Sequence, residues 1–296
     1  MKNDIAANPS PSFSFNAYWQ LMRFDKPIGV LLLLWPTLWA LCLAAGGLPP
    51  VKTAIIFILG VFLMRAAGCV INDFADRKID GQVQRTKTRP IVSGSVSARG
   101  AIALFVCLCL CAFTLVLMTN TLTVALSFGG VALAFCYPFM KRHTHLPQVV
   151  LGAAFAWGIP MAFAAINNSI DPRSWLIYTT VVLWTVVYDT FYAMVDRPDD
   201  LKIGVKSTAI LFGEGDRLIT ACLQVMVLMG LIMIGKQFEL GFCFEVSVLV
   251  VAGLFAWQQK LIKHRHRDDC FKAFLNNNWV GAAVFVGIAL DQVFKL

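Results

Sequence analysis

Charged residues are scarce in this sequence of 296 residues. Lys, Arg, Asp and Glu together make up 14% of it, whereas 58% of the residues are hydrophobic and the mean hydropathy is +0.70. An average soluble domain contains about 25% charged residues. The deficit excludes an ordinary soluble fold and predicts an integral membrane protein.

Polar stretches long enough to form a separate soluble domain are also lacking. A membrane span needs about 20 mostly apolar residues, and nine candidate spans fill the chain. They begin near Ile28, Val51, Ala101, Leu122, Pro147, Ser174, Arg217, Phe242 and Val280. We therefore predict an all-α fold with a single bundle of nine transmembrane helices in residues 28–296, preceded by a leader and interfacial segment in residues 1–27.

Cysteine and histidine patterns typical of metal sites are absent from the sequence. The nine cysteines form no Cys-x-x-Cys pair and lie mostly in apolar runs, as small buried hydrophobic side chains do. The four histidines alternate in two basic loops, residues 143–145 and 264–266, without a third or fourth ligand nearby. A zinc site is therefore not expected.

The N-terminal segment lacks a short apolar core followed by a small-residue cleavage site, so we expect no removable signal peptide. Basic residues, which give a net charge of +8, gather before the first span and after the even-numbered spans. By the positive-inside rule, the N-terminus and these loops are predicted to be cytoplasmic. The basic surplus thus indicates topology, and no nucleic-acid partner is expected.

Acidic residues number only 17, yet seven of them lie in two short segments. The first segment, residues 72–80, reads Asn-Asp-Phe-Ala-Asp-Arg-Lys-Ile-Asp. On a helix, the spacing of Asp73, Asp76 and Asp80 places their side chains on one face. A Mg²⁺ ion held by carboxylates, substrate phosphate oxygens and water would compensate their charge. A solvated acidic patch at a helix end is the alternative.

The second acidic segment follows the same plan. Its residues Asp189, Tyr192, Asp196 and Asp200 recur at helical spacing and share one predicted face. The fragment Asp-Arg-x-x-Asp occurs in both segments, at residues 76–80 and 196–200, which suggests an internal repeat. Two carboxylate clusters that face one cavity would suit a diphosphate bridged by metal.

Cations accompany both acidic segments. Arg65 lies inside the second span, two helical turns before Asn72 and on the same face. A charge at a span centre costs about 2.5 to 3.5 kcal/mol, so Arg65 is expected to face a partner inside the bundle. That partner is either a ligand or, structurally, Asp189. Further cations follow in the loops, among them Arg89 and Lys206, and they suit a diphosphate clamp or simply mark cytoplasmic loops.

The two acidic segments together, Asn72-Asp73-x-x-Asp76-x-x-x-Asp80 and Asp189-x-x-Tyr192-x-x-x-Asp196-x-x-x-Asp200, resemble the two signatures of the UbiA-type intramembrane prenyltransferases. Residues 23–29, 137–142 and 202–208 resemble the branch of this family that prenylates 4-hydroxybenzoate in ubiquinone synthesis. The resemblance covers nearly the whole chain. One departure is Pro198, where that branch more often has an acidic residue; it removes a possible carboxylate and a backbone donor.

The resemblance implies a nine-helix fold and a Mg²⁺-dependent transfer of a polyprenyl group from its diphosphate to 4-hydroxybenzoate in the bacterial inner membrane, among membrane lipid. It implies metal ligands at Asp73, Asp76, Asp196 and Asp200, with Asp189 as a further catalytic residue. The implied substrate-binding residues are Arg65, Asn72, Asp80, Arg89, Lys141, Tyr192, Arg197 and Lys206. Arg65 would hold the benzoate carboxylate. Another prenyl acceptor or, less simply, a secondary transporter is the alternative.

Overall fold

The computed structural model describes residues 14–82 and 84–294; residues 1–13 of the predicted leader therefore lie outside the described residues. Within these ranges the chain folds into helices, and nine helical segments are long and apolar enough to cross a membrane. The predicted all-α fold with nine spans is confirmed. The protein is thus a multi-pass membrane protein.

A short helix, α1 (Phe15–Leu21), precedes the spans. The helices of the spans are α2 (Ile28–Ala45), α3 (Val51–Asp76), α4 (Ala98–Val116), α5 (Thr121–Cys136), α6 (Pro147–Ala156), α7 (Gly158–Asn167), α8 (Arg173–Ile203), α9 (Thr208–Phe212), α10 (Asp216–Gln237), α11 (Phe242–Leu261) and α12 (Arg267–Phe294). Two spans are composite, since α6 and α7 form the fifth and α9 and α10 the seventh.

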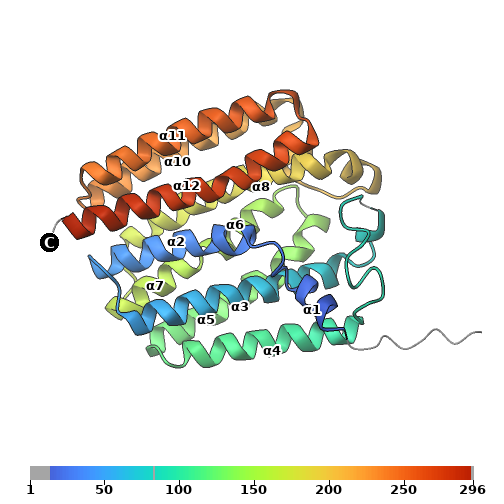
Figure 1. Cartoon of the computed structure of the whole chain (residues 1–296), viewed down its shortest axis with the longest axis horizontal. Helices are drawn as coiled ribbons and strands as arrows, with labels where there is room; N and C mark the ends of the chain where they lie inside the picture. Colours follow the sequence, from blue (N-terminus) through green and yellow to red (C-terminus); the bar gives the residue numbers. More distant parts are fainter. Residues whose placement is uncertain (1–13, 83, 295–296) are drawn as a thin grey trace, which may run out of the picture.

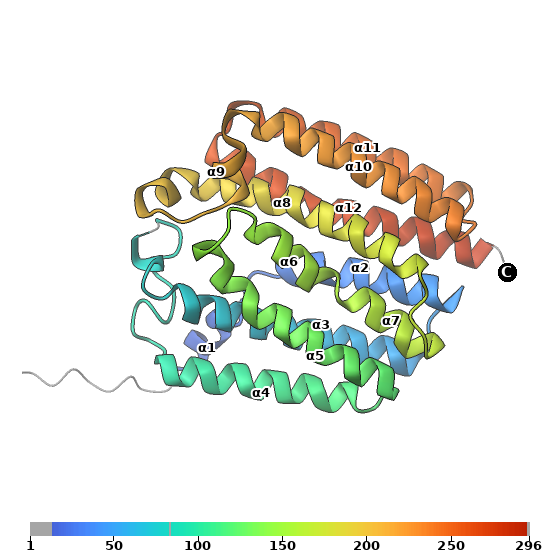
Figure 2. The same ribbon diagram turned by 180° about the vertical axis from the view of Figure 1, so that it is seen from behind.

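The helices form a single bundle. In Figures 1 and 2, α8, α10, α11 and α12 lie along one side and α3, α4 and α5 along the other, with α2, α6 and α7 between them. Helix α8 packs on α6, α10 and α12. The largest core cluster includes Trp39 of α2 and Trp184 of α8, whose rings stack 5.5 Å apart. The second motif therefore lies on a helix that packs against several others.

Helix α12 begins at Arg267, so the prediction of a ninth span beginning near Val280 was wrong by more than three turns of helix. The misleading signal was the polar run 276–278, three consecutive asparagines. In the structure each asparagine side-chain oxygen accepts a hydrogen bond from a different helix. The donors are Gln258 of α11, Trp184 of α8 and Trp35 of α2. Because these polar groups are satisfied inside the bundle, they do not end the helix.

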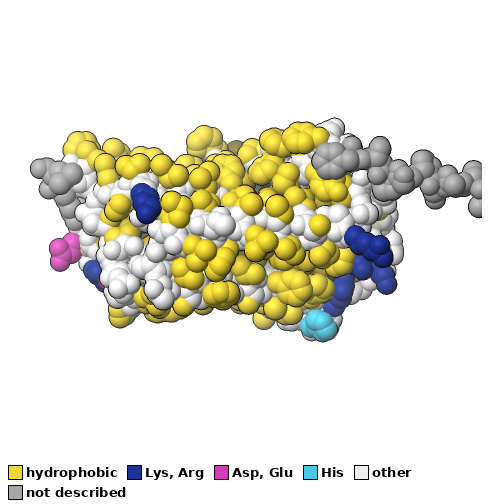
Figure 3. Space-filling view, turned by 90° about the horizontal axis from the view of Figure 1, so that it is seen from below, with side chains coloured by type: hydrophobic (Ala, Val, Ile, Leu, Met, Phe, Trp, Pro, Cys, Tyr) yellow, Lys and Arg dark blue, Asp and Glu magenta, His cyan; other side chains and the backbone are white. Residues whose placement is uncertain are grey.

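The outer surface of the bundle is apolar. Large hydrophobic side chains such as Leu110, Phe128 and Leu249 are exposed on it, as expected for side chains that face lipid. On the face that Figure 3 shows, hydrophobic side chains cover the middle of the molecule, and Lys and Arg are most numerous at one end. The loop between α3 and α4 lies at that end (Figure 1). The Lys and Arg side chains therefore gather at the same end of the bundle as the loop that follows the first acidic motif.

Candidate active site

The first acidic motif lies where α3 ends. Asn72, Asp73 and Asp76 belong to α3, and both aspartates are buried. The helix stops at Asp76, and Asp80 begins a short 3-10 helix, so the prediction that all three aspartates share one α-helical face was wrong. The loop folds back instead. Arg89 bonds Asp73 at 3.0 Å and Asp80 at 2.6 Å, and this contact brings both carboxylates to the same place.

The second motif lies on one uninterrupted helix, as predicted. Asp189, Tyr192, Asp196 and Asp200 all belong to α8. Pro198 lies inside α8 without ending it, and the helix continues to Ile203. The four side chains line the same cavity. Their helical spacing therefore does present them on a common face.

Both motifs face a single polar cavity of about 1190 Å³. Of the thirteen residues predicted for the site, twelve line it: Arg65, Asn72, Asp73, Asp76, Asp80, Arg89, Lys141, Asp189, Tyr192, Asp196, Asp200 and Lys206. Residues from α2, α3, α8, α12 and the loop after α3 form its walls. The fold thus brings together two segments that are more than 100 residues apart in the sequence.

Arg197 is the predicted site residue that does not line this cavity. It directly follows Asp196 on α8, and consecutive helical residues point about 100° apart. Its Nη1 instead donates to Asp216 at 3.2 Å. Asp216 is fully buried and also accepts hydrogen bonds from Arg265. The structure thus gives Arg197 a place in a buried ion-pair cluster and not at the polar cavity.

Basic side chains hold each carboxylate of the first motif. Arg23 donates to both carboxylate oxygens of Asp73 at 3.0 Å, and Lys141 donates to Asp76 at 3.0 Å. Arg23 has a φ of 61°, a left-handed conformation that is uncommon outside glycine. The sequence reasoning did not assign Arg23 to the site, although it lies in the stretch 23–29 that resembles the 4-hydroxybenzoate branch.

The second motif has one strongly held carboxylate. Arg85 binds Asp196 through two hydrogen bonds, from Nε at 3.0 Å and from Nη2 at 2.5 Å. The same guanidinium lies 4.5 Å from the centre of the Tyr192 ring. Asp189 and Asp200, by contrast, have no basic nitrogen within 4.0 Å in the part of the chain that the structure describes. Arg85 was not among the predicted site residues, because its partner is 111 residues away in the sequence.

Burial and oppositely charged neighbours have opposing effects on the pKa values of the loop residues Asp80 and Arg89. Burial raises the pKa of Asp80 above its ordinary value, an effect that the charge of Arg89 opposes and that Asp76 reinforces. Burial lowers the pKa of Arg89, but the carboxylates of Asp73 and Asp80 outweigh burial, so that the pKa is raised overall. Arg89 therefore stays charged and holds the loop to α3.

The carboxylates fit a metal ion that substrate helps to hold. Among the described residues, no group of three or more His, Cys, Asp or Glu side chains is placed to enclose one ion. Mg²⁺ commonly takes one or two carboxylates and completes its coordination with phosphate oxygens and water. Two facing motifs in a cavity of this size match that mode. They do not match an all-protein metal cage.

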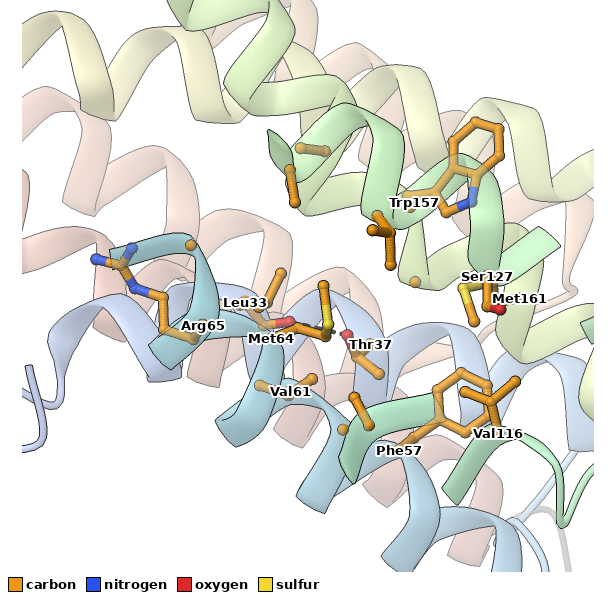
Figure 4. A pocket seen from close by; sticks show the side chains of 18 of the residues that line it. Leu33, Thr37, Phe57, Val61, Met64, Arg65, Val116, Ser127, Trp157 and Met161 are labelled. Atoms are coloured by element: carbon orange, nitrogen blue, oxygen red, sulfur yellow. Dashed lines mark hydrogen bonds between the residues drawn. The ribbon is translucent and has the colours of Figure 1, made fainter. Parts of the chain in front are cut away.

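A smaller apolar pocket of about 180 Å³ adjoins the polar cavity. Figure 4 shows Phe57, Val61 and Met64 along it, with Arg65 at one end. Five residues line both spaces and mark their junction: Arg65, Gly68, Tyr137, Leu151 and Phe155. A molecule with a charged head and an apolar tail could therefore place its head between the two motifs and lead its tail past Arg65.

Comparison with known proteins agrees with this arrangement. The model of the UbiA prenyltransferase family matches residues 33–282, which is most of the chain. This chain belongs to the UbiA prenyltransferase family. Among similar UbiA proteins, a 4-hydroxybenzoate octaprenyltransferase from Saccharophagus degradans is 64% identical over 94% of this chain and 93% of its own. Another from Hahella chejuensis is 58% identical over the full length of both chains.

Solved UbiA structures share the fold. The apo structure of a UbiA homolog from Aeropyrum pernix is 26% identical, with a TM-score of 0.79, and the match covers 88% of this chain and 97% of that one. A UbiA homolog from Archaeoglobus fulgidus bound to GPP and Mg²⁺ is 16% identical, with a TM-score of 0.72, over 94% and 99% of the two chains. At 16% identity, the match to the Archaeoglobus fulgidus protein shows a shared fold and nothing more.

Proposed function

We propose that this protein transfers a polyprenyl group from an allylic diphosphate to 4-hydroxybenzoate and releases pyrophosphate. The new bond forms at the ring carbon ortho to the phenol, as in ubiquinone synthesis. The observation that carries the proposal is the meeting of the two aspartate motifs in one polar cavity that opens into an apolar pocket. The names of the relatives at 58–64% identity support the choice of acceptor.

The diphosphate occupies the polar cavity in this proposal. Asp73 and Asp76 face Asp196 and Asp200 across it, and these four carboxylates would hold Mg²⁺. Bound Mg²⁺ supplies charge neutralisation that makes pyrophosphate a better leaving group. On the protein side, the nearby cations Arg89 and Lys141 exchange carboxylate contacts for phosphate oxygens. Lys206, whose Nζ donates to the backbone oxygen of His143 at 3.4 Å, adds a third cation. Asn72 and Asp80 complete the wall that faces the diphosphate.

The acceptor occupies the junction between the two spaces. Arg65 binds its carboxylate there, since a guanidinium matches a carboxylate through two parallel hydrogen bonds. Asp189 and Tyr192 line the polar cavity, and they orient the phenol by hydrogen bonds. The prenyl tail of the diphosphate substrate extends along the apolar pocket toward lipid. Apolar walls exclude water from the reacting carbon and so favour attack by the ring over hydrolysis.

The proposal includes a location and a topology. Residues 28–296 act as one prenyltransferase domain in the bacterial inner membrane, with the N-terminus and the motif-bearing loops in the cytoplasm. Single cysteines introduced near Lys87 and Lys202 should then react with a membrane-impermeant thiol reagent from the same side. Labelling from opposite sides would reject the topology.

The test of function uses purified protein with 4-hydroxybenzoate and geranyl diphosphate. We expect prenylated 4-hydroxybenzoate and pyrophosphate with Mg²⁺, and neither when a chelator removes the metal. Homogentisate and dihydroxynaphthoate serve as alternative acceptors. Turnover of one of these, without turnover of 4-hydroxybenzoate, would replace the acceptor in the proposal. Full activity under excess chelator would remove Mg²⁺ from it.

A further inference from the structure

Arg65 stands apart from the arginines that hold the motifs. Arg23, Arg85 and Arg89 each bond an aspartate at 3.0 Å or less. Arg65, over the part of the chain that the structure describes, has no carboxylate within 4.0 Å, and its enclosed Nε has no hydrogen-bond partner. The Phe155 ring centre lies 5.7 Å from the Cζ of Arg65. Arg65 thus carries a positive charge that forms no ion pair with any carboxylate of the described residues.

The position of this charge is fixed by packing. A side chain at Gly29 of α2 would overlap the Arg65 guanidinium, so the absence of a Cβ there allows α2 to lie directly against it. Arg65 also lines both the polar cavity and the apolar pocket. Figure 4 shows its guanidinium at the end of the apolar pocket, beyond Val61 and Met64. A substrate whose head lies in one space and whose tail lies in the other must pass this charge.

We propose that Arg65 makes ionisation of the prenyl diphosphate depend on the presence of the acceptor. This inference rests on the proposed function. Ionisation breaks the allylic C–O bond, both electrons leave with the pyrophosphate oxygen, and the allylic carbon becomes cationic. An uncompensated guanidinium at the junction repels that developing cation. A bound benzoate carboxylate neutralises Arg65, removes the repulsion and places the phenol ring beside the cation at the same time.

The expected size of the effect is large enough to measure. Two unit positive charges about 6 Å apart, in surroundings of effective dielectric constant about 20, repel strongly enough to slow ionisation on the order of a hundredfold. Without the acceptor, the prenyl diphosphate therefore stays intact instead of losing its cation to water. With the acceptor, the ortho carbon attacks the cation, a C–C bond forms and that carbon gives up its proton to a base.

Two partial acceptors separate the carboxylate from the nucleophile. Benzoate carries the carboxylate but lacks the phenol, whereas phenol carries the nucleophile but lacks the carboxylate. With purified protein, Mg²⁺ and geranyl diphosphate, saturating benzoate should raise pyrophosphate and geraniol release at least tenfold over no addition, because water captures the cation. Phenol should leave the release within about twofold of the value without addition.

Two variants of Arg65 distinguish the effect of its positive charge on hydrolysis from the effect of its guanidinium geometry on acceptor binding. Arg65→Gln removes the charge, so acceptor-free hydrolysis should rise at least tenfold and no longer respond to benzoate. Arg65→Lys retains the charge, so acceptor-free hydrolysis should stay low although acceptor binding weakens. Arg267→Gln is the control. It removes one positive charge from the same cavity, where Arg267 bonds Asp199 at 3.2 Å, and benzoate should still stimulate hydrolysis as in the parent protein.

The outcomes distinguish this inference from the proposed function. If the parent protein prenylates 4-hydroxybenzoate but benzoate does not raise pyrophosphate release, the function stands and the charge dependence is rejected. Equal acceptor-free hydrolysis by the parent protein and by folded Arg65→Gln, judged by a single monodisperse peak in detergent, rejects it as well. If the parent protein does not prenylate 4-hydroxybenzoate at all, the function and the inference both fail.

Discussion

The two aspartate motifs contain the same Asp-Arg-x-x-Asp fragment but are built differently. In the first, α3 ends at Asp76, and each carboxylate of the motif bonds an Arg or Lys side chain. In the second, α8 continues past Asp200, and only Asp196 has such a partner in the described ranges. Equal sequence spacing therefore does not give equal structure.

The difference suggests a division of labour across the cavity. The first motif is fixed by cations that come from the N-terminal segment, the following loop and residue 141. The second motif is fixed by its own helix, which leaves Asp189 and Asp200 without a cationic partner at close range in the described part of the protein. We infer that the cations of the first side bind phosphate oxygens while carboxylates of both sides hold the metal. On the second side, Asp200 is free to bind metal and Asp189 to orient the phenol.

The largest expected effect comes from removing a single carboxylate, either from the first motif or from the second. Asp73→Asn and Asp196→Asn should each lower kcat/KM for the diphosphate by about a hundred- to a thousandfold, because charge stabilisation by one preorganised group is worth that much. Both proteins should still insert into membranes. If either variant kept full activity, the corresponding side would not take part in the reaction.

Smaller effects are expected from the cations that hold the motifs. Arg89 bonds two carboxylates and Arg85 bonds one. Hydrogen bonds to charged groups contribute about 1.5 to 3 kcal/mol, so Arg89→Gln should raise the KM for the diphosphate about ten- to a hundredfold. Arg85→Gln should raise it less. Measured KM values in the reverse order would contradict the assignment of phosphate binding to the first side.

The repeated Asp-Arg-x-x-Asp fragment has an arginine at the same place in each motif, Arg77 and Arg197, and the two are expected to differ in their contribution to stability. Arg197 bonds the fully buried Asp216, whereas Arg77 stacks on the Phe74 ring with Cζ 4.1 Å from its centre. Arg197→Gln should destabilise the protein by about 1 to 3 kcal/mol. Arg77→Gln should cost about 1 kcal/mol or less. Thermal unfolding of both variants in the same detergent measures the difference, and equal melting temperatures would refute it.

The smallest effect is expected at Pro198. Proline in a helix interior removes a backbone hydrogen bond, yet α8 continues through it. Pro198→Ala should therefore raise the melting temperature by a few degrees, with kcat changed by less than about threefold. A large loss of activity would show that a proline-dependent bend of α8 positions Asp200. Lys202→Ala, an exposed substitution on the same helix, serves as the control for both measurements.

Patterns within one sequence segment predicted those features of the fold that depend on residues close together in the sequence. Apolar runs of span length located the nine spans, and helical spacing placed the second motif on one face of α8. The same spacing failed for Asp80, because α3 ends at Asp76 and Asp80 lies in the short 3-10 helix that follows. The start of α12 was missed because the asparagines at 276–278 look unsuited to a membrane until their partners on other helices are known.

Other features depend on contacts between distant segments. The bond from Arg23 to Asp73 joins residues 50 positions apart, and the bond from Arg85 to Asp196 joins residues 111 positions apart. No periodicity within one segment encodes such pairs. Arg197 shows the converse, since the family resemblance implied a role in substrate binding, whereas the turn of the helix directs its side chain to Asp216.

The central claim is that the two motifs act on one bound diphosphate. It is tested most directly by comparing the single variants Asp73→Asn and Asp196→Asn with the double variant, with kcat/KM for geranyl diphosphate as the measurement. If both carboxylates serve the same metal-diphosphate complex, the losses are not additive, and the double variant falls within about tenfold of the worse single variant. A double variant whose loss equals the product of the two single losses would contradict a shared site.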